Sequence, residues 1–309
     1  MPRIDRRRFI TIAAAMGVAV AGGPALAAPR PVTWRGQAMG AEATLILNHP
    51  DPARAADILR RVESELRRLE GIFTLYRADS ELSHLNRTGA LAAPSPEMVA
   101  ALRLAQAAHE ATGGRFDPTV QPLWRAYAAG ADAEALARAR GLIGFKRVTV
   151  GEDLVVLPWG MQLTLNGIAQ GHISDRIAAL LRAEGAVNTL VNMGEISAIG
   201  GRSAGVPWRV GLSGGGEVEL ADRALAVTEP SGFTFDADGR LPHLIDPSSG
   251  APRAEWRRVA VTAPQAGLAD ALSTGLALAP APAIRDVVAA LPGIQVRALD
   301  AQGRENLFG

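Results

Sequence analysis

The chain has 309 residues, of which 48% are hydrophobic and 20% are charged. This is an ordinary globular composition, and it excludes a disordered or fibrous protein. Lysine and arginine (32) balance aspartate and glutamate (31) to a formal charge of +1, so no basic surface for nucleic acid is implied. The absence of cysteine excludes disulfides, thiolate metal sites, a cysteine nucleophile and a lipid anchor on an N-terminal cysteine.

Residues 1–27 have the pattern of an export signal. Three arginines at positions 6–8 precede an apolar run from Ala13 to Ala21, and Ala25-Leu26-Ala27 closes the segment. Paired arginines, a weakly apolar core and a small-x-small cleavage signal predict the twin-arginine export route. A membrane helix is the alternative, but the run is short and is interrupted by glycine and proline. We therefore expect cleavage near Ala27 and a periplasmic domain spanning residues 28–309.

Strand and helix patterns mix in the mature chain without a strict β-α-β alternation. Strands are predicted for 42–48, 153–165, 187–193, 207–212, 223–228 and 257–262. Helices are predicted for 52–72, for the segment from Ser95-Pro96 to Gly113-Gly114, around Ile173 to Leu181, and from Asp270 to about Leu278. This mixture favours an α+β class, with a single domain in which helices flank the sheets.

Two segments place polar groups near a helix end. Residues 112–119 (TGGRFDPT) join a glycine stop to an Asp-Pro turn, which a plain helix cap explains without any site. In residues 163–172 (LTLNGIAQGH), a strand enters a helix through Asn-Gly, so backbone N–H groups point at a possible anion. Phosphate binding and a simple helix start both fit. Gly171 costs about 1 kcal/mol relative to alanine inside a helix, so we expect close packing there.

Two further segments carry a histidine and a carboxylate. His243 stands three residues before an Asp-Pro turn in 241–250, where a general acid or base and a structural histidine both fit. Asp270 and Thr274 are four residues apart and face one side of a predicted first helical turn. They could hold a hard cation with backbone carbonyls, or serve as an N-cap and a buried threonine. His109 is expected on a helix surface, and the histidine spacing makes zinc unlikely to be the metal.

Taken together and in this order, these segments resemble the ApbE family, the FAD:protein FMN transferases. The resemblance covers essentially the whole mature chain, from Met39-Gly40 to Thr274. The matching motifs are YRADSELSHLN (76–86), TGGRFDPTVQPLW (112–124), NGIAQGHISD (166–175), VNMGEI (191–196), HLIDPSSG (243–250) and DALSTGL (270–276). The 166–175 motif is similar to the form in the periplasmic branch that includes the NosX proteins.

The resemblance implies Mg²⁺-dependent transfer of FMN from FAD to a threonine or serine hydroxyl of an acceptor flavoprotein, with release of AMP. The implied acceptor is an exported domain of a respiratory membrane flavoprotein, NosR-like in kind. The metal ligands would be the Gly167 carbonyl, Asp270 and Thr274, and the catalytic residues His243 and Asp270. The residues along the FAD would be Met39, Tyr76, Arg115, Phe116, Asp117, Thr164, Gln170 and His243.

The chain departs from the family pattern at a few positions. The family usually has aspartate where Thr164 stands and lysine where Gln170 stands, and glutamine cannot supply a charge to a phosphate. Glu195 occupies a Gly-Gly-Asp region that is one residue short. These departures leave two alternatives to transfer: a periplasmic protein that binds FAD for delivery, and a pyrophosphatase that splits FAD into FMN and AMP.

Overall fold

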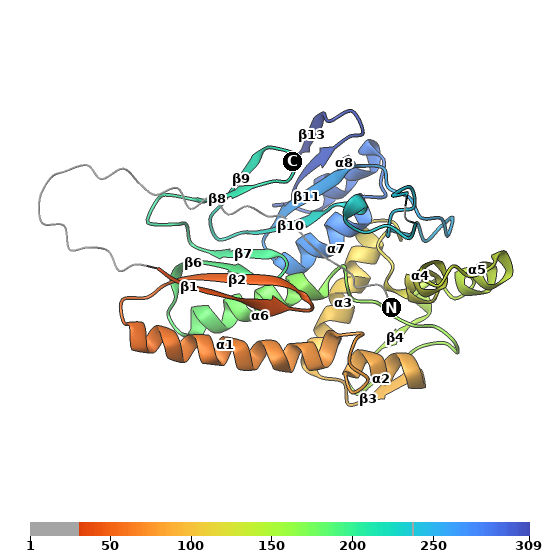
Figure 1. The fold of residues 1–309 in the computed structure, drawn as a ribbon, viewed down its shortest axis with the longest axis horizontal. Coiled ribbons are helices and arrows are strands. Elements are labelled where there is room, and N and C mark those ends of the chain that lie inside the picture. Colours follow the sequence, from red (N-terminus) through yellow and green to blue (C-terminus); the bar gives the residue numbers. More distant parts are fainter. Residues whose placement is uncertain (1–30, 237) are drawn as a thin grey trace, which may run out of the picture.

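The structure is a computed structural model that describes residues 31–236 and 238–309. The expected export signal and its cleavage site lie outside the described residues. In the part of the chain that is described, no helix is both long and apolar enough to span a membrane. The elements are arranged as a large sheet with helices packed against it and smaller sheets at its margins (Figure 1).

The main sheet, as far as the described residues show it, has eight strands, and each strand runs antiparallel to its neighbours. Their spatial order is β1-β2-β6-β7-β10-β11-β12-β13. The strands are β1 (Val32–Ala38), β2 (Ala41–Asn48), β6 (Val187–Asn192), β7 (Ile196–Ile199), β10 (Ala224–Thr228), β11 (Arg258–Ala263), β12 (Gln295–Leu299) and β13 (Glu305–Phe308).

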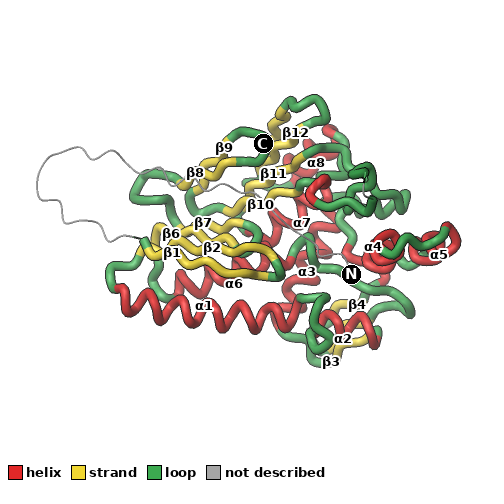
Figure 2. The backbone as a smooth tube through the Cα atoms, viewed as in Figure 1, coloured by secondary structure: helices red, strands yellow, loops and turns green. Residues whose placement is uncertain are grey.

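Four helices carry most of the packing around this sheet. Helix α6 (Ala169–Ala183) contacts β6 and β7, and α7 (Ala266–Leu276) contacts β10 and β11. Outside them lie α1 (Pro52–Phe73) against α6 and α3 (Pro96–Ala111) against α7 (Figure 2). The apolar faces of α1, α3 and α6 meet in one continuous core with β2. Helix α8 (Ala281–Ala290) contacts β12 and β13 at the far end of the sheet.

The smaller elements cover the remaining surfaces. The hairpin of β8 (Trp208–Gly211) and β9 (Glu217–Leu220) packs apolar side chains against β7 and β10. The sheet of β3 (Ala90–Ala92), β5 (Leu154–Val156) and β4 (Thr149–Val150) lies next to α2 (Glu81–Thr88). Helices α4 (Gln121–Ala128) and α5 (Ala133–Arg140) protrude at one end of the molecule (Figure 1).

The expected α+β class is confirmed, as are most of the expected elements. Asp51 and Ser95 cap α1 and α3 through their side chains, as their sequence positions predict. The strand expected over 153–165 is wrong beyond Val156. There the extended chain is held by a side chain instead of a strand, because Asn86 bonds both the N–H and the carbonyl of Leu163 at 2.7 and 2.8 Å.

Helix α7 begins four residues earlier than the sequence predicts, so the alternative in which Asp270 is an N-cap is wrong. In its place, the carboxylate of Asp175 on α6 accepts the N–H groups of Ala266 and Gly267 at 2.8 and 2.9 Å. Conversely, Asp270 on α7 accepts the N–H of Gly171 in the first turn of α6 at 3.1 Å. Each helix therefore satisfies unpaired donors at the start of the other.

Gly171 lets these two helices touch, as its position inside a helix predicts. A Cβ atom there would lie 2.2 Å from the carbonyl oxygen of Ala266 and 2.8 Å from the Cα of Gly267. Both neighbours are backbone atoms, so they cannot move aside as a side-chain tip could.

We expect Gly171→Ala to destabilise the fold by more than about 2 kcal/mol, because the methyl group forces α6 and α7 apart. The matched control is Gly71→Ala in α1, where a Cβ meets no atom within 4 Å. That change should stabilise the protein by about 0.5–1 kcal/mol through the unfolded chain. Urea unfolding measures both, and equal effects in the two variants would contradict the packing argument.

The core also contains an uncharged histidine. His172 on α6 is largely buried and packs edge-on against Phe73 of α1, with ring centroids 5.5 Å apart. Its Nε2 has no hydrogen-bond partner among residues 31–236 and 238–309. Burial, and secondarily the charge of Arg176, lower the pKa of His172 from 6.5 to about 4. Protonation of this ring is therefore much less favourable in the folded state than in the unfolded state.

We expect acid to weaken the fold through His172. Between pH 6.5 and pH 4 the unfolded chain takes up a proton on this residue that the folded chain does not, so stability falls as the pH falls. The full effect is about 3 kcal/mol, and it is absent above pH 7.5. Urea unfolding of the wild type and of His172→Leu at pH 7.5 and pH 4 measures it. An equal acid loss in both proteins would rule out this source.

Candidate functional site

A cavity opens between the end of α3, the loop before α6, the end of β10 and the side of α7. Its empty volume is about 1510 Å³, including space open to solvent. Its lining includes Arg115, Phe116, Asp117, Trp124, Thr164, Gly167, Thr228, Phe233, His243 and Thr274.

Oxygen donors from two segments meet at one wall of this cavity. A Cβ atom on Gly167 would lie 2.8 Å from Oγ1 of Thr274, so the backbone at Gly167 directly faces the Thr274 hydroxyl. Asp270 lies one turn before Thr274 on α7 and is 2% exposed. It does not line the cavity, at least as far as the described residues show, and its Oδ2 holds Gly171. The structure therefore brings together the three residues that the resemblance implies as metal ligands.

The chemistry of this donor set fits a hard cation. A hydroxyl, a carboxylate and a backbone carbonyl are the oxygen ligands that Mg²⁺ and Ca²⁺ accept in proteins. Within the described parts of the chain, no group of three or more His, Asp or Glu side chains is placed to hold a metal. A cation at this wall would therefore have one carboxylate and would take further oxygens from water or from a phosphate ligand.

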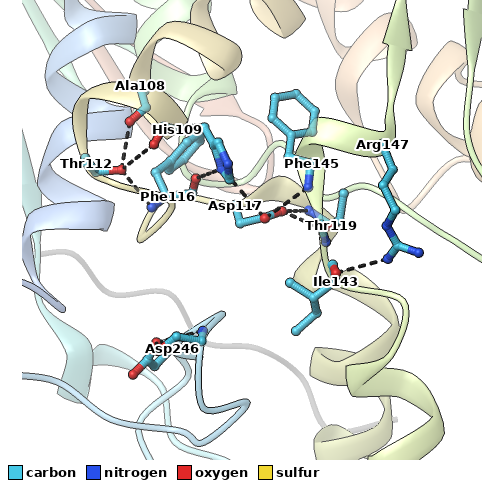
Figure 3. Close-up of polar contacts among 12 residues, drawn as sticks. Ala108, His109, Thr112, Phe116, Asp117, Thr119, Ile143, Phe145, Arg147 and Asp246 are labelled. Carbon is cyan, nitrogen blue, oxygen red and sulfur yellow. Dashed lines mark hydrogen bonds and ion pairs between the residues drawn. The ribbon is translucent and has the colours of Figure 1, made fainter.

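The loop after α3 forms another part of the cavity wall, and its conformation is held by Asp117 (Figure 3). One oxygen of Asp117 accepts the N–H and the hydroxyl of Thr119 at 2.8 and 2.5 Å, and the other accepts the N–H of Phe145 at 3.1 Å. The plain helix cap and Asp-Pro turn are therefore present. The same segment also lines the cavity, so the structural and the functional interpretations are compatible.

His243 has a defined tautomer at the cavity wall. Its Nδ1 lies 3.1 Å from the carbonyl oxygens of both Pro230 and Phe233. Carbonyl oxygens only accept, so Nδ1 carries the proton and the lone pair of the neutral ring is on Nε2. This is the form in which a histidine can act as a base.

The turn after His243 is held by Asp246, as expected. Its Oδ1 accepts the N–H and the hydroxyl of Ser248 at 2.9 and 2.7 Å. Partial burial acts to raise the pKa of Asp246, but the hydrogen bonds from Ser248 and the charge of Arg253 outweigh it and hold that pKa below its usual value. The turn therefore keeps its charged anchor at neutral pH.

Three residues expected along the FAD do not line the cavity within the described structure. Met39 lies in the turn between β1 and β2, where its N–H donates to Glu70 at 2.7 Å, and Tyr76 is 65% exposed in the loop after α1. Gln170 is 2% exposed, and a Cβ on Gly194 would lie 2.5 Å from its amide carbon and nitrogen. The side chain of Gln170 thus packs against the turn between β6 and β7, away from the cavity wall.

The structure also brings to the cavity polar and aromatic groups that were not among the site residues expected from the sequence. The hydroxyls of Thr228 and Ser273 lie 2.7 Å apart, and Ser273 donates to the carbonyl of Asp270 at 3.0 Å. Thr228 lines the cavity, and its hydrogen bond with Ser273 ties it to α7 one residue before Thr274. A polar residue at the end of the buried strand 224–228 was the available signal.

Three side chains with aromatic rings pack together along the cavity. Trp124 of α4 stacks on Phe233 with ring centroids 5.9 Å apart, and Phe233 meets His243 edge-on at 6.3 Å. These three side chains come from two segments more than 100 residues apart, so sequence spacing alone could not group them. Together with Arg115 and the oxygen donors at Gly167 and Thr274, they define a site suited to an aromatic ligand that carries phosphate.

The chain belongs to the ApbE family, whose family model matches residues 39–298. The FAD:protein FMN transferase of Salmonella typhimurium is 29% identical over 304 residues, which span 87% of this chain and 85% of that protein. The enzyme of the same name from Treponema pallidum is 32% identical over 254 residues, spanning 70% and 69% of the two chains. The expected family and enzyme class are therefore confirmed.

Solved structures show the same fold. The flavin transferase ApbE from Vibrio cholerae superposes with a TM-score of 0.78 at 26% identity, covering 90% of this chain and 97% of that one. The flavinyl transferase ApbE from Pseudomonas stutzeri, in its apo form, gives a TM-score of 0.80 at 24% identity and covers 92% and 97% of the two chains.

We expect Gly167→Ala to weaken cation binding by at least about tenfold, because the added Cβ pushes the backbone away from the Thr274 hydroxyl. Binding of Mn²⁺ in the presence of FAD, followed by paramagnetic resonance, measures this loss. Gly71→Ala, outside the site, should bind Mn²⁺ as the wild type does. Unchanged binding in a folded Gly167→Ala protein would show that this contact does not form the cation site.

Proposed function

We propose that this protein transfers FMN from FAD to a threonine or serine hydroxyl of an acceptor flavoprotein, with Mg²⁺ as cofactor and AMP as the second product. The observation that carries the proposal is the contact of Gly167 with Thr274 at the cavity wall, one helical turn from Asp270. The curated relatives named FAD:protein FMN transferase support the choice of FAD as the substrate.

The residues of the cavity divide this work among them. The carbonyl of Gly167, Asp270 and Thr274 would hold Mg²⁺. When bound, Mg²⁺ neutralises charge on the phosphate oxygens and so favours attack at phosphorus. Arg115 lines the cavity, where its Nη1 donates to the carbonyl of Thr112 at 2.9 Å, and its positive charge would pair with phosphate. Phe116, Trp124 and Phe233 offer aromatic surface for the rings of FAD.

The transfer exchanges one phosphorus–oxygen bond for another. The acceptor hydroxyl oxygen forms a bond to the phosphorus on the riboflavin side, and the bond from that phosphorus to the bridging oxygen breaks. AMP leaves with the bridging oxygen and its electron pair. The hydroxyl proton passes to Nε2 of His243, whose tautomer is set by the carbonyls of Pro230 and Phe233. His243 then returns this proton to solvent.

The sequence pattern supports the proposed location, and the family resemblance supports the proposed partner. The arginine-led segment 1–27 supports export by the twin-arginine route and a periplasmic domain of residues 28–309. The acceptor would be an exported domain of a respiratory membrane flavoprotein, NosR-like in kind. We expect neither nucleic acid as a partner nor a lipid anchor on cysteine.

Transfer is tested with the purified protein, FAD, Mg²⁺ and an exported acceptor domain, followed by mass spectrometry of the acceptor. We expect a mass gain of one FMN moiety.

Thr274→Val should lower the rate more than about 100-fold by removing a cation ligand, whereas Thr274→Ser keeps the hydroxyl and most of the rate. Asp270→Ala should abolish the AMP release.

The alternative functions give different products in the same assay. Release of FMN and AMP without a mass gain would identify a pyrophosphatase. FAD that binds and stays intact would identify a delivery protein. Either result, with an acceptor that a known transferase modifies, would overturn the proposal.

A further inference from the structure

His109 is buried at the end of α3, contrary to its expected place on the helix surface. It is 8% exposed, and its ring meets Phe145 edge-on with centroids 5.8 Å apart. The chain turns back beneath the ring at Gly114, where φ is +82° and a Cβ would lie 3.5 Å from Cε1 of His109. His109 therefore continues the buried face of α3 that Leu102 and Ala105 mark, and the glycine turn after the helix closes over its ring.

His109 holds the peptide group of Phe116 from inside the fold (Figure 3). Its Nδ1 lies 2.9 Å from the Phe116 carbonyl oxygen, and since a carbonyl only accepts, Nδ1 donates. The N–H of Phe116 donates to Oγ1 of Thr112 at 3.0 Å. Both polar backbone atoms of Phe116 are thus bound by side chains from the end of α3.

Phe116 in turn lies directly on α7, next to the proposed cation ligand. A Cβ on Gly275 would lie 2.8 Å from Cγ2 of Thr112, 3.0 Å from the Cβ of Phe116 and 3.1 Å from its nitrogen, so Thr112 and Phe116 both pack directly on α7. Gly275 is the residue after Thr274. A shift of the Phe116 peptide therefore changes the spacing between the wall of Arg115 to Asp117 and the Thr274 hydroxyl.

We infer that His109 is a positioning residue for this site. By donating from Nδ1 to Phe116, it holds the cavity wall of residues 115–117 at a set distance from Thr274 on the facing helix. His109 itself is absent from the residues that line the cavity among those described, so it acts through Phe116. The inference rests on the proposed function for the identity of the ligand, FAD.

The test compares FAD affinity, read from flavin fluorescence without acceptor, in variants of the full mature chain. His109→Leu removes the donor and should raise the Kd for FAD about tenfold or more, because FAD binding must then order the peptide of Phe116 that His109 holds in place in the wild type. His109→Asn should bring the Kd back to within about threefold, because its amide nitrogen can occupy the place of Nδ1. His172→Leu is the matched control, since it removes another largely buried imidazole, one that does not line the cavity.

Steady-state kinetics and thermal unfolding complete the test. In transfer assays, His109→Leu should raise the KM for FAD more than it lowers kcat, and His109→Asn should reverse the change in KM. Should His109→Leu fail to fold, Thr112→Val perturbs the same peptide from its N–H side and should also weaken FAD binding.

Three results would overturn the inference: wild-type FAD affinity in the His109 and Thr112 variants, no rescue by a folded His109→Asn, or an equal loss in His172→Leu. None of these depends on an acceptor. A protein that binds FAD with the expected variant pattern but modifies no acceptor would contradict the proposed transfer while leaving the role of His109 intact.

Discussion

The antiparallel register of α6 against α7 is the constraint on which the site depends. Three contacts follow one another at steps of four residues on each segment: Asp175 with Ala266, Gly171 with Asp270, and Gly167 with Thr274. Four residues advance a helix by about 6 Å, slightly more than one turn, so the three pairs lie along one seam. The first two pairs complete the helix starts, and the third reaches the cavity.

Unsatisfied backbone donors explain why this register is specific. Neither Ile168 nor Gln265, the cap positions of α6 and α7, makes a side-chain cap within the described structure. Each helix start therefore depends on a carboxylate from the other helix. Burial raises the pKa of Asp175, and the N–H groups of Gly267 and Ala266 oppose that rise. A slip of one residue would leave buried donors and carboxylates unpaired, which costs more than most single contacts contribute.

The local parts of the fold could be predicted from the sequence, and the long-range parts could not. Asp51 and Ser95 cap their own helices, so each start is encoded within a few residues. Helix α7 was placed too late because its cap, Asp175, is about 90 residues away. The false strand after Val156 has a similar cause, since it depends on the distant Asn86. The burial of His109 has a local cause, because His109 continues the apolar face of Leu102 and Ala105 on its own helix. Within the site, the motif order identified Gly167, Asp270 and Thr274, whereas Thr228 and Phe233 needed the fold.

The departures from the family pattern at Thr164 and Gln170 fall in different environments, and this limits what they can change. Thr164 lies on the cavity wall, where its N–H donates to the carbonyl of Pro118 at 2.9 Å and its Oγ1 accepts the N–H of Asn166 at 3.3 Å. An aspartate can make the same local turn, so threonine keeps the backbone that leads to Gly167 and removes only a negative charge. Gln170 lies in the interior against Gly194 and does not line the cavity in the described structure. Having glutamine at this position in place of lysine therefore removes no charge from the side chains that line the cavity. The oxygen donors at Gly167, Asp270 and Thr274 therefore stay in register despite both substitutions, because that register is set by the seam between α6 and α7.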